Sequence, residues 1–223
     1  MSNTMGLIDL SMTIRPMWRW PIEKELLKDI ASGDPYQVTA TKMGMHAFTH
    51  IDTPLHIELG RESIETVDLE RLCGSTAVID LTPVSANQEI GADLLIKRGI
   101  HVLPGDIVLL KTCWDLSRDY TTKEYWLDAP HLNRDAAQWL SELSLKAVGF
   151  DFPQDYVIRE IPDRHPSAEE MPTHDLLLRK GILLIEYLCN LDQIKTNRVD
   201  LYALPLKISG TDGACARVVA VED

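Results

Sequence analysis

Seven short runs of mainly apolar residues constrain the fold of this chain more than any other feature of its sequence. They cover residues 7–10, 77–81, 107–111, 147–150, 182–185, 202–208 and 217–221. Each run is too short for an ordinary helix, and most lack the polar alternation of a half-exposed strand. Unbroken apolar runs of this length are typical of strands that are covered on both faces. We therefore expect a compact mixed sheet or barrel.

Four helical patterns lie between these strands, at residues 23–30, 92–98, 134–143 and 173–180. Asn133 is suited to cap the third pattern, and Gly181 follows the last residue of the fourth. Because strands and helices interleave, the chain is expected to be α/β, with a mixed, barrel-like sheet and surrounding helices. Its 223 residues show no break in composition, so residues 1–223 are expected to form a single domain.

The charge balance excludes one class of partner. The chain has 22 Lys and Arg against 34 Asp and Glu, a formal charge of −12, so we expect no nucleic acid partner. The N-terminal residues lack the pattern of a signal peptide, and no apolar run reaches 18 residues, so we expect no membrane contact and a cytoplasmic location. The four cysteines form no CxxC pair and are expected to be reduced thiols.

The stretch HAFTHIDTPLH, residues 46–56, gathers possible metal ligands. It places His46, His50, Asp52 and His56 within eleven positions. Imidazole and carboxylate groups are the ligands that hold zinc or manganese. If the stretch is a strand, His50 and Asp52 project to the same side. Pro54 would end regular strand pairing and fix how Asp52 and His56 lie relative to each other.

The remaining ligands of such a site must come from elsewhere, and spacing alone does not choose among the carboxylates and His101, His131, His165 and His174. A single histidine is more often a hydrogen-bonded core or surface residue, but four such groups in eleven positions weaken that interpretation. The sequence contains neither HExxH nor GxSxG, which argues against a zinc peptidase and a serine hydrolase. Cys189 or Cys215 as a nucleophile is a minor alternative.

The stretch at residues 46–56 resembles the signature of a known family, the cyclases or bacterial kynurenine formamidase-like metal-dependent hydrolases. The family signature is H-x-G-T-H-x-D-x-P-x-H, and the chain differs from it only at Phe48, which replaces the glycine. The family also has a histidine twelve residues before a glutamate, matched by His174 and Glu186. The ending PLKISGTDGACAR resembles the family's last motif, with Ala214-Cys215 in place of Ser-Pro. This resemblance implies a swivelling β/β/α fold and a homodimer or homotetramer.

The resemblance also implies roles for single residues. His46, His50 and Asp52 would bind one metal, and Asp52 and Glu186 would be shared with a second metal that His174 also binds, so we expect one or two Zn²⁺ or Mn²⁺ ions per chain. His56 would be the catalytic acid and base, because the pKa of histidine lies near the working pH. A divalent ion makes water a nucleophile near neutral pH. The expected reaction is hydrolysis of a small amide, formamide, cyclic amide or lactone.

The substrate is less constrained by the sequence. Trp18 and Trp20 lie where formamidases of the family carry a substrate-contacting aromatic residue, although both could simply pack in the core. The P-G-D-T run that usually follows is absent, so isatin-like lactams, other cyclic amides and lactones compete with N-formylkynurenine. A metal-dependent lyase or cyclase and a catalytically idle binding protein are the alternatives. Structural roles are favoured over pocket-lining ones for Asp151, Asp155, Arg164 and His165.

Overall fold

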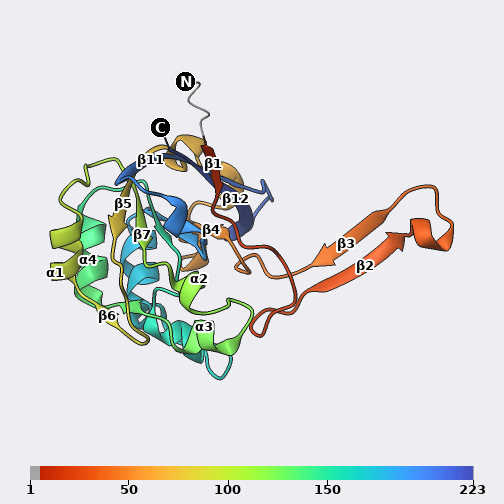
Figure 1. Ribbon diagram of the computed structural model, residues 1–223, viewed down its shortest axis with the longest axis horizontal. Helices are drawn as coiled ribbons and strands as arrows, with labels where there is room; N and C mark the ends of the chain where they lie inside the picture. The colour runs from red at the N-terminus through yellow and green to blue at the C-terminus, as the bar shows by residue number, and fades with distance from the viewer. Residues whose placement is uncertain (1–5, 223) are drawn as a thin grey trace.

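The computed structural model describes residues 6–222, and its centre is an eight-stranded mixed sheet (Figure 1). The strand order is β1-β12-β11-β5-β7-β9-β10-β4, and a further pairing of β12 with β4 closes every strand except β1 into a ring. The bounds are β1 Gly6–Asp9, β4 His50–Asp52, β5 Cys73–Asp80, β7 Ile107–Lys111, β9 Ala147–Phe150, β10 Leu183–Glu186, β11 Arg198–Pro205 and β12 Gly213–Glu222. The predicted α/β class with a barrel-like core is confirmed.

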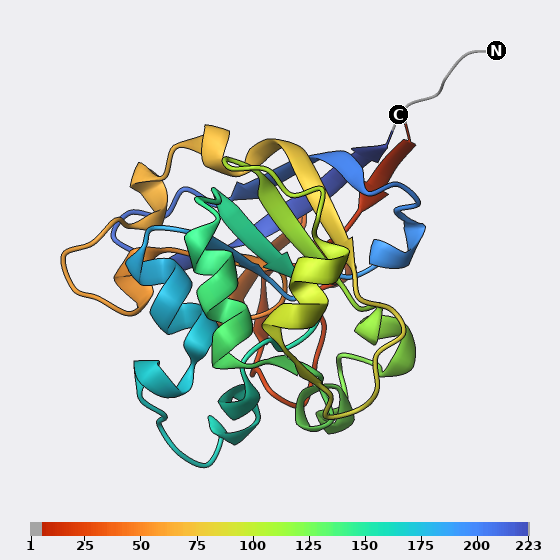
Figure 2. The ribbon, with the colours of Figure 1, turned by 90° about the vertical axis from the view of Figure 1, so that its left-hand side faces the viewer.

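Strands β5, β7, β9 and β10 run parallel to one another, and the other pairs of this sheet are antiparallel. Parallel neighbours need a crossover, which α1 (Ala92–Arg98) supplies between β5 and β7, and α4 (Arg134–Glu142) between β7 and β9. These two helices lie side by side across one face of the sheet (Figure 2). The side-chain oxygen of Asn133 accepts from the Ala136 amide at 3.0 Å, which confirms the predicted cap of α4.

The remaining elements are short. They are the helices α2 (Trp114–Ser117) and α3 (Lys123–Leu127), the π-helix η7 (His174–Leu178), the small strands β6 (Glu89–Ile90) and β8 (His131–Leu132), and the 3₁₀ segments η1 Ile30–Ser32, η2 Pro54–His56, η3 Ile64–Thr66, η4 Leu69–Arg71, η5 Tyr156–Glu160, η6 Ala168–Glu170 and η8 Leu191–Gln193. Among the described residues, no helix is long and apolar enough to cross a membrane.

Two buried apolar clusters occupy the two faces of the sheet. Val108 and Leu110 of β7 pack in the cluster under the helices, whereas Ile107 and Leu109 of the same strand pack in the cluster inside the ring. Both faces of β7 are therefore covered, which is why its sequence is apolar at successive positions. The predicted strands at 107–111 and 147–150 have the observed bounds, and 217–221 lies within β12. The segment predicted at 202–208 is shifted, because β11 covers Arg198–Pro205.

The helix predicted at residues 23–30 is wrong. This segment forms β2 (Glu23–Lys28), which pairs with β3 (Val38–Lys42) in an antiparallel hairpin that projects away from the body (Figure 1). The β2 side chains are all exposed, so the helix-like spacing of Leu26, Leu27 and Ile30 meets no core. Without a core to pack on, that spacing does not stabilise a helix. The extended backbone instead gains its hydrogen bonds from β3.

Candidate metal centre and active site

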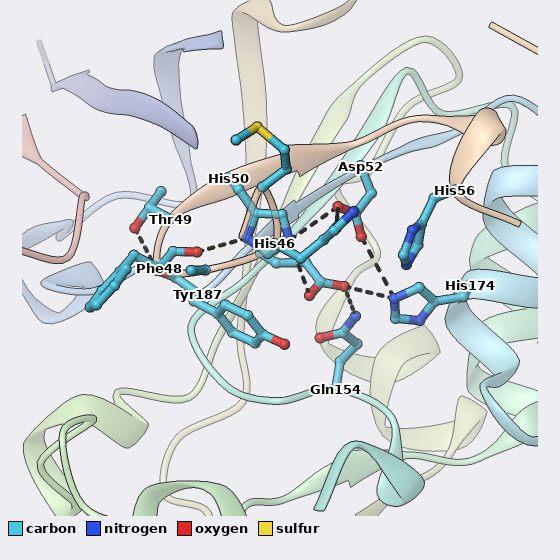
Figure 3. Close-up of polar contacts among 12 residues, drawn as sticks. His46, Phe48, Thr49, His50, Asp52, His56, Gln154, His174 and Tyr187 are labelled. Carbon is cyan, nitrogen blue, oxygen red and sulfur yellow. Dashed lines mark hydrogen bonds and ion pairs between the residues drawn. The ribbon is translucent and has the colours of Figure 1, made fainter. Parts of the chain in front are cut away.

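Strand register brings the predicted ligands together from distant parts of the chain (Figure 3). His50 and Asp52 lie on β4, and Glu186 at the end of β10 pairs directly with His50. Their side chains share one face, because residues opposite each other in an antiparallel pair project to the same side. His174 opens the π-helix η7. His46 precedes β4.

Two carboxylates form the centre of this cluster. Asp52 Oδ1 lies 2.7 Å from His46 Nδ1 and 3.0 Å from His50 Nε2. Glu186 Oε1 lies 3.2 Å from His174 Nε2, and the other oxygen, Oε2, lies 3.7 Å from His50 Nε2. Asp52 Oδ2 lies 3.6 Å from the same nitrogen of His174. The structure therefore brings together all five residues that the family resemblance implies as metal ligands.

The second ring nitrogen of each histidine is held by a hydrogen bond from outside the cluster. His50 Nδ1 donates to the Phe48 carbonyl at 2.7 Å. His174 Nδ1 pairs with Asp155 Oδ2 at 2.6 Å, and His46 Nε2 pairs with an Asp212 oxygen at 2.9 Å. Such bonds fix the orientation of a metal-binding imidazole and leave its inner nitrogen available.

The residues present fit a divalent cation. Asp52 is completely buried, and its Oδ2 and the Nε2 of His50 have no hydrogen-bond partner among residues 6–222. Buried polar atoms without partners are costly, so this arrangement requires a cation or protons between the ligands. Two sets of ligand atoms lie within 4.8 Å of one another: His46, Asp52 and His56 form one, and His50, Asp52 and Glu186 the other. The nitrogen and oxygen donors suit zinc or manganese.

Phe48 takes a backbone conformation that favours glycine, the residue at this position of the family signature. Its φ is +60°, in the left-handed region that disfavours residues with a side chain. This turn directs the Phe48 carbonyl to the ring of His50. The Phe48 side chain is almost fully buried, 1% exposed, and its ring lies edge-on to that of Tyr120. Phe48 therefore takes a conformation that glycine adopts without strain, and its side chain packs in the core.

Asp212 is a residue of the site that the sequence analysis missed. Its Oδ2 lies 2.9 Å from His46 Nε2 and 3.0 Å from His56 Nδ1, and the two imidazole rings are stacked with their centroids 4.0 Å apart. The hydrogen bonds from His46 and His56 hold the pKa of Asp212 far below its usual range. The only sequence signal was the Asp-Gly pair in PLKISGTDGACAR. Gln154, which donates to Glu186 Oε1, had no signal.

The charges of the cluster shift several pKa values in the metal-free protein. Burial opposes the charged form of His46, but attraction to Asp52 and the hydrogen bonds to Asp212 and Asp52 raise its pKa to about 10. Burial is likewise outweighed at His174, where Glu186 and Asp155 raise the pKa well above the usual value. Burial would raise the pKa of Asp52, yet His46 and His50 hold it well below its ordinary value. Protons therefore occupy positions that a cation can take.

A cavity of about 260 Å³ opens on the cluster. Its lining residues are Arg19, Trp20, His46, Asp52, His56, Ile158, Ile161, His165, Pro166, Met171, His174, Glu186 and Tyr187. Trp20 lines the cavity, and the substrate contact that the family resemblance implies for it stays a prediction. Trp18 is 44% exposed and does not line it.

The other candidates divide between pocket and scaffold. His165 lines the cavity, and Asp155 positions His174. Asp151 is buried and accepts from the Thr112 and Cys113 amides, which is a structural role, and Arg164 forms exposed ion pairs. His101, which bonds to the Val78 carbonyl, and His131 lie outside the cluster.

All four cysteines are free, as predicted. Burial raises the pKa of Cys189 to about 12 and also raises the pKa of Cys215. The thiolate is the reactive form, so a raised pKa argues against either residue as a nucleophile.

Comparison with known proteins identifies the family. Residues 8–154 match the family model described as putative cyclase. The chain belongs to this family. It is 31% identical over 177 residues to kynurenine formamidase of Bacillus thuringiensis subsp. konkukian (strain 97-27), covering 79% of this chain and 76% of the relative. Kynurenine formamidase of Bacillus mycoides (strain KBAB4) is 29% identical over 222 residues, covering 97% of this chain and 98% of the relative.

Solved structures agree with this family and its fold. A potential metal-dependent hydrolase with cyclase activity superposes with a TM-score of 0.76 at 29% identity, covering 99% of both chains. Isatin hydrolase A from Labrenzia aggregata superposes with a TM-score of 0.80 at 22% identity, covering 97% of this chain and 93% of that one, which shows the shared fold. Family membership and the cluster together make this chain an enzyme, a metal-dependent hydrolase of the amide-cleaving type.

Proposed function

We propose that this chain hydrolyses a small N-formyl arylamine or a cyclic amide, with lactones as the nearest competing substrates. The observation that carries the proposal is the convergence of two buried carboxylates and four histidines on one largely apolar cavity. A cavity of about 260 Å³ suits a molecule with one aromatic ring rather than a peptide. The relatives named kynurenine formamidase support a formamide as the substrate. Because the P-G-D-T run is absent, lactams remain candidate substrates as well.

The proposed ligands are His46, His50, Asp52, His174 and Glu186, for one or two ions of Zn²⁺ or Mn²⁺. A bound divalent ion would polarise the substrate carbonyl and lower the pKa of water to near neutrality. The mixed nitrogen and oxygen donors suit both metals. Two negatively charged carboxylates would offset part of the charge of the ions.

His56 is proposed as the acid and base. Its Nδ1 lies 3.0 Å from Asp212, which can accept only, so Nδ1 carries the proton and Nε2 is free. Nε2 would take a proton from water as the new C–O bond forms and return it to the leaving nitrogen as the C–N bond breaks. The products are a carboxylic acid and an amine. Because His56 also lies among the ligand atoms near His46 and Asp52, its role needs a direct test.

The test combines elemental analysis with turnover of arylformamides, lactams, imides and lactones. We expect stoichiometric zinc or manganese, hydrolysis of at least one amide, loss of activity on chelation and recovery when metal is restored. In His56→Ala, metal content should persist while turnover falls by at least 10²-fold. Loss of metal in that variant would make His56 a ligand. Full activity of metal-free protein would overturn the proposal.

We also propose that residues 1–223 act as one domain and that the chain forms a homodimer through the β2–β3 hairpin. The hairpin exposes Leu26 (52%), Leu27 (53%), Ile30 (61%) and Tyr36 (57%) on a projecting segment. An isolated two-stranded hairpin is marginally stable in water, so these side chains need a surface to cover them. A second copy can supply one, because twofold symmetry lets two hairpins pack reciprocally.

We also propose a cytoplasmic location for this chain, which its free thiols support.

A further inference from the structure

Arg19 lines the same cavity and is the one Lys or Arg among the described residues that line it. Its guanidinium lies over two indole rings, 5.2 Å from the ring centre of Trp20 and 4.9 Å from that of Trp126. Nη1 donates to the Ile158 carbonyl at 2.8 Å. These contacts hold the positive charge in a fixed position at the wall of the cavity.

The hydrogen-bonding capacity of Arg19 is largely unused. A guanidinium has five N–H donors, and within residues 6–222 the only hydrogen bond found for Arg19 is the one to Ile158. Its Nε is buried without a partner. No described carboxylate lies within ion-pair distance, in contrast to Arg198, which forms a two-point pair with Asp106. In a chain of charge −12, an arginine without a carboxylate at a ligand cavity calls for an external anion.

We propose that Arg19 binds a carboxylate of the substrate. On the proposed hydrolase function, the substrate class narrows to amides that carry both an aryl or similar apolar group and a carboxylate. Carboxylate matches the fork of a guanidinium, which can donate two parallel hydrogen bonds to it. Ile158, Ile161 and Met171 supply apolar wall for the rest of the molecule.

A purely structural role for Arg19 is the competing explanation. Its bond to Ile158 could simply tie η5 (Tyr156–Glu160) to the segment around Trp20. A structural tie would affect charged and neutral substrates alike. A carboxylate-binding role would affect only the charged ones, so paired substrates separate the two roles.

The experiment uses metal-loaded protein and pairs each carboxylate with its methyl ester. The substrates are N-formylkynurenine, the isomeric formamidobenzoates and their esters. We expect wild-type kcat/KM to favour at least one acid over its ester by tenfold or more. Arg19→Met should lower kcat/KM for that acid by about 10- to 100-fold, mainly through KM, and change the ester less than threefold. Arg19→Lys should recover part of the loss.

Arg15→Met is the matched control. Arg15 also lies over an aromatic ring, 4.7 Å from the centre of Tyr120, but pairs with Asp119 and lies outside the cavity. We expect it to leave both substrates unchanged. Equal losses for acid and ester in Arg19→Met would overturn the inference and leave the hydrolase proposal intact. An acid preference that survives in Arg19→Met would also overturn it, because the carboxylate would then bind elsewhere, such as at the metal.

Binding measurements separate failure of this inference from failure of the proposed function. Titration with aminobenzoates and their methyl esters, followed by tryptophan fluorescence, requires no turnover. We expect wild type to bind the acid at least tenfold more tightly than the ester. Arg19→Met should bind the acid and the ester with equal affinity. If no amide, lactam or lactone is hydrolysed, the function fails while this difference still supports the anion site. Equal binding of acid and ester to wild type would overturn the site.

Discussion

At the scale of single residues, Phe48 shows how a strained backbone supports the site. A left-handed φ for a residue with a side chain costs about 1–2 kcal/mol. Burying a phenylalanine side chain is worth more, since truncation of a buried Phe typically costs about 3–5 kcal/mol. The core packing of Phe48 therefore outweighs its backbone strain. The same backbone turn directs the Phe48 carbonyl to His50.

This balance predicts an unusual order of stabilities at position 48. Phe48→Ala loses the packing and keeps the strain, whereas Phe48→Gly loses the packing and relieves the strain. We expect both variants to be less stable than wild type, with the glycine variant about 1 kcal/mol more stable than the alanine variant. Elsewhere glycine is usually the less stable of the two. Urea unfolding of the metal-free proteins measures the difference, and an alanine variant at least as stable as glycine would contradict the assigned φ.

At the scale of elements, the register of β4 with β10 assembles the site. Pairing of Glu186 with His50 is fixed by the ladder, and a slip of one residue would turn Glu186 to the opposite face. On its other edge β4 pairs with β12, where Gly213 lies opposite Asp52 and follows Asp212. A Cβ on Gly213 would come within 2.6 Å of the Ile51 carbonyl, so this position requires glycine. Three strands thus deliver ligands and the Asp212 carboxylate to one place.

The exposed apolar side chains of the β2–β3 hairpin lead to a prediction at this scale. Leu26→Glu combined with Leu27→Glu places two charges on its apolar surface, and we expect this double variant to be monomeric where wild type is dimeric. Multi-angle light scattering after size-exclusion chromatography measures the mass. The control is Ile100→Glu with Leu103→Glu, two side chains that are 85% and 58% exposed on the body. A wild-type monomer, or a double variant at position 26/27 that stays dimeric, would contradict the proposed interface.

At the scale of the whole molecule, stability and metal binding should respond to pH in opposite directions. The pKa of His46 is raised to about 10 in the metal-free fold, against 6.5 for an ordinary histidine. Its protonated form therefore stabilises the fold fully below pH 6.5, and this contribution is lost as pH rises toward 10. A metal must displace protons from the same groups, so metal affinity should rise over that interval.

We therefore expect the Tm of the metal-free protein to fall between pH 6.5 and pH 10. The affinity for Zn²⁺ should rise by up to about tenfold per pH unit for each proton displaced. Thermal unfolding in chelator and competition with a chromophoric chelator measure the two quantities. Asp212→Asn is a useful comparison, because it removes one of the carboxylates that raise the pKa of His46 and should flatten both profiles. A pH-independent metal affinity would contradict the proton occupancy of the cluster.

The sequence by itself determined the class of fold and most of the metal cluster. The apolar runs at 107–111 and 147–150 are local signals for buried strands. The tertiary structure agrees with them, because both faces of these strands are buried. The histidines and Asp52 of HAFTHIDTPLH lie close in sequence, so their proximity in space could be predicted without knowledge of the fold. His174 and Glu186 came from resemblance to the family, because spacing alone could not choose them.

Only the tertiary structure decided the hairpin, the role of Phe48 and the contacts of Asp212, Gln154 and Arg19. The segment at 23–30 has helical spacing, but a helix there would need a core to pack against. Within residues 6–222 no core lies beneath it, and the segment pairs with β3 as a strand instead. Asp212 reaches His46 from 166 positions away, through a strand pairing that no local pattern encodes. Local propensity and spacing act over a few residues, whereas ladder register and burial depend on the whole fold.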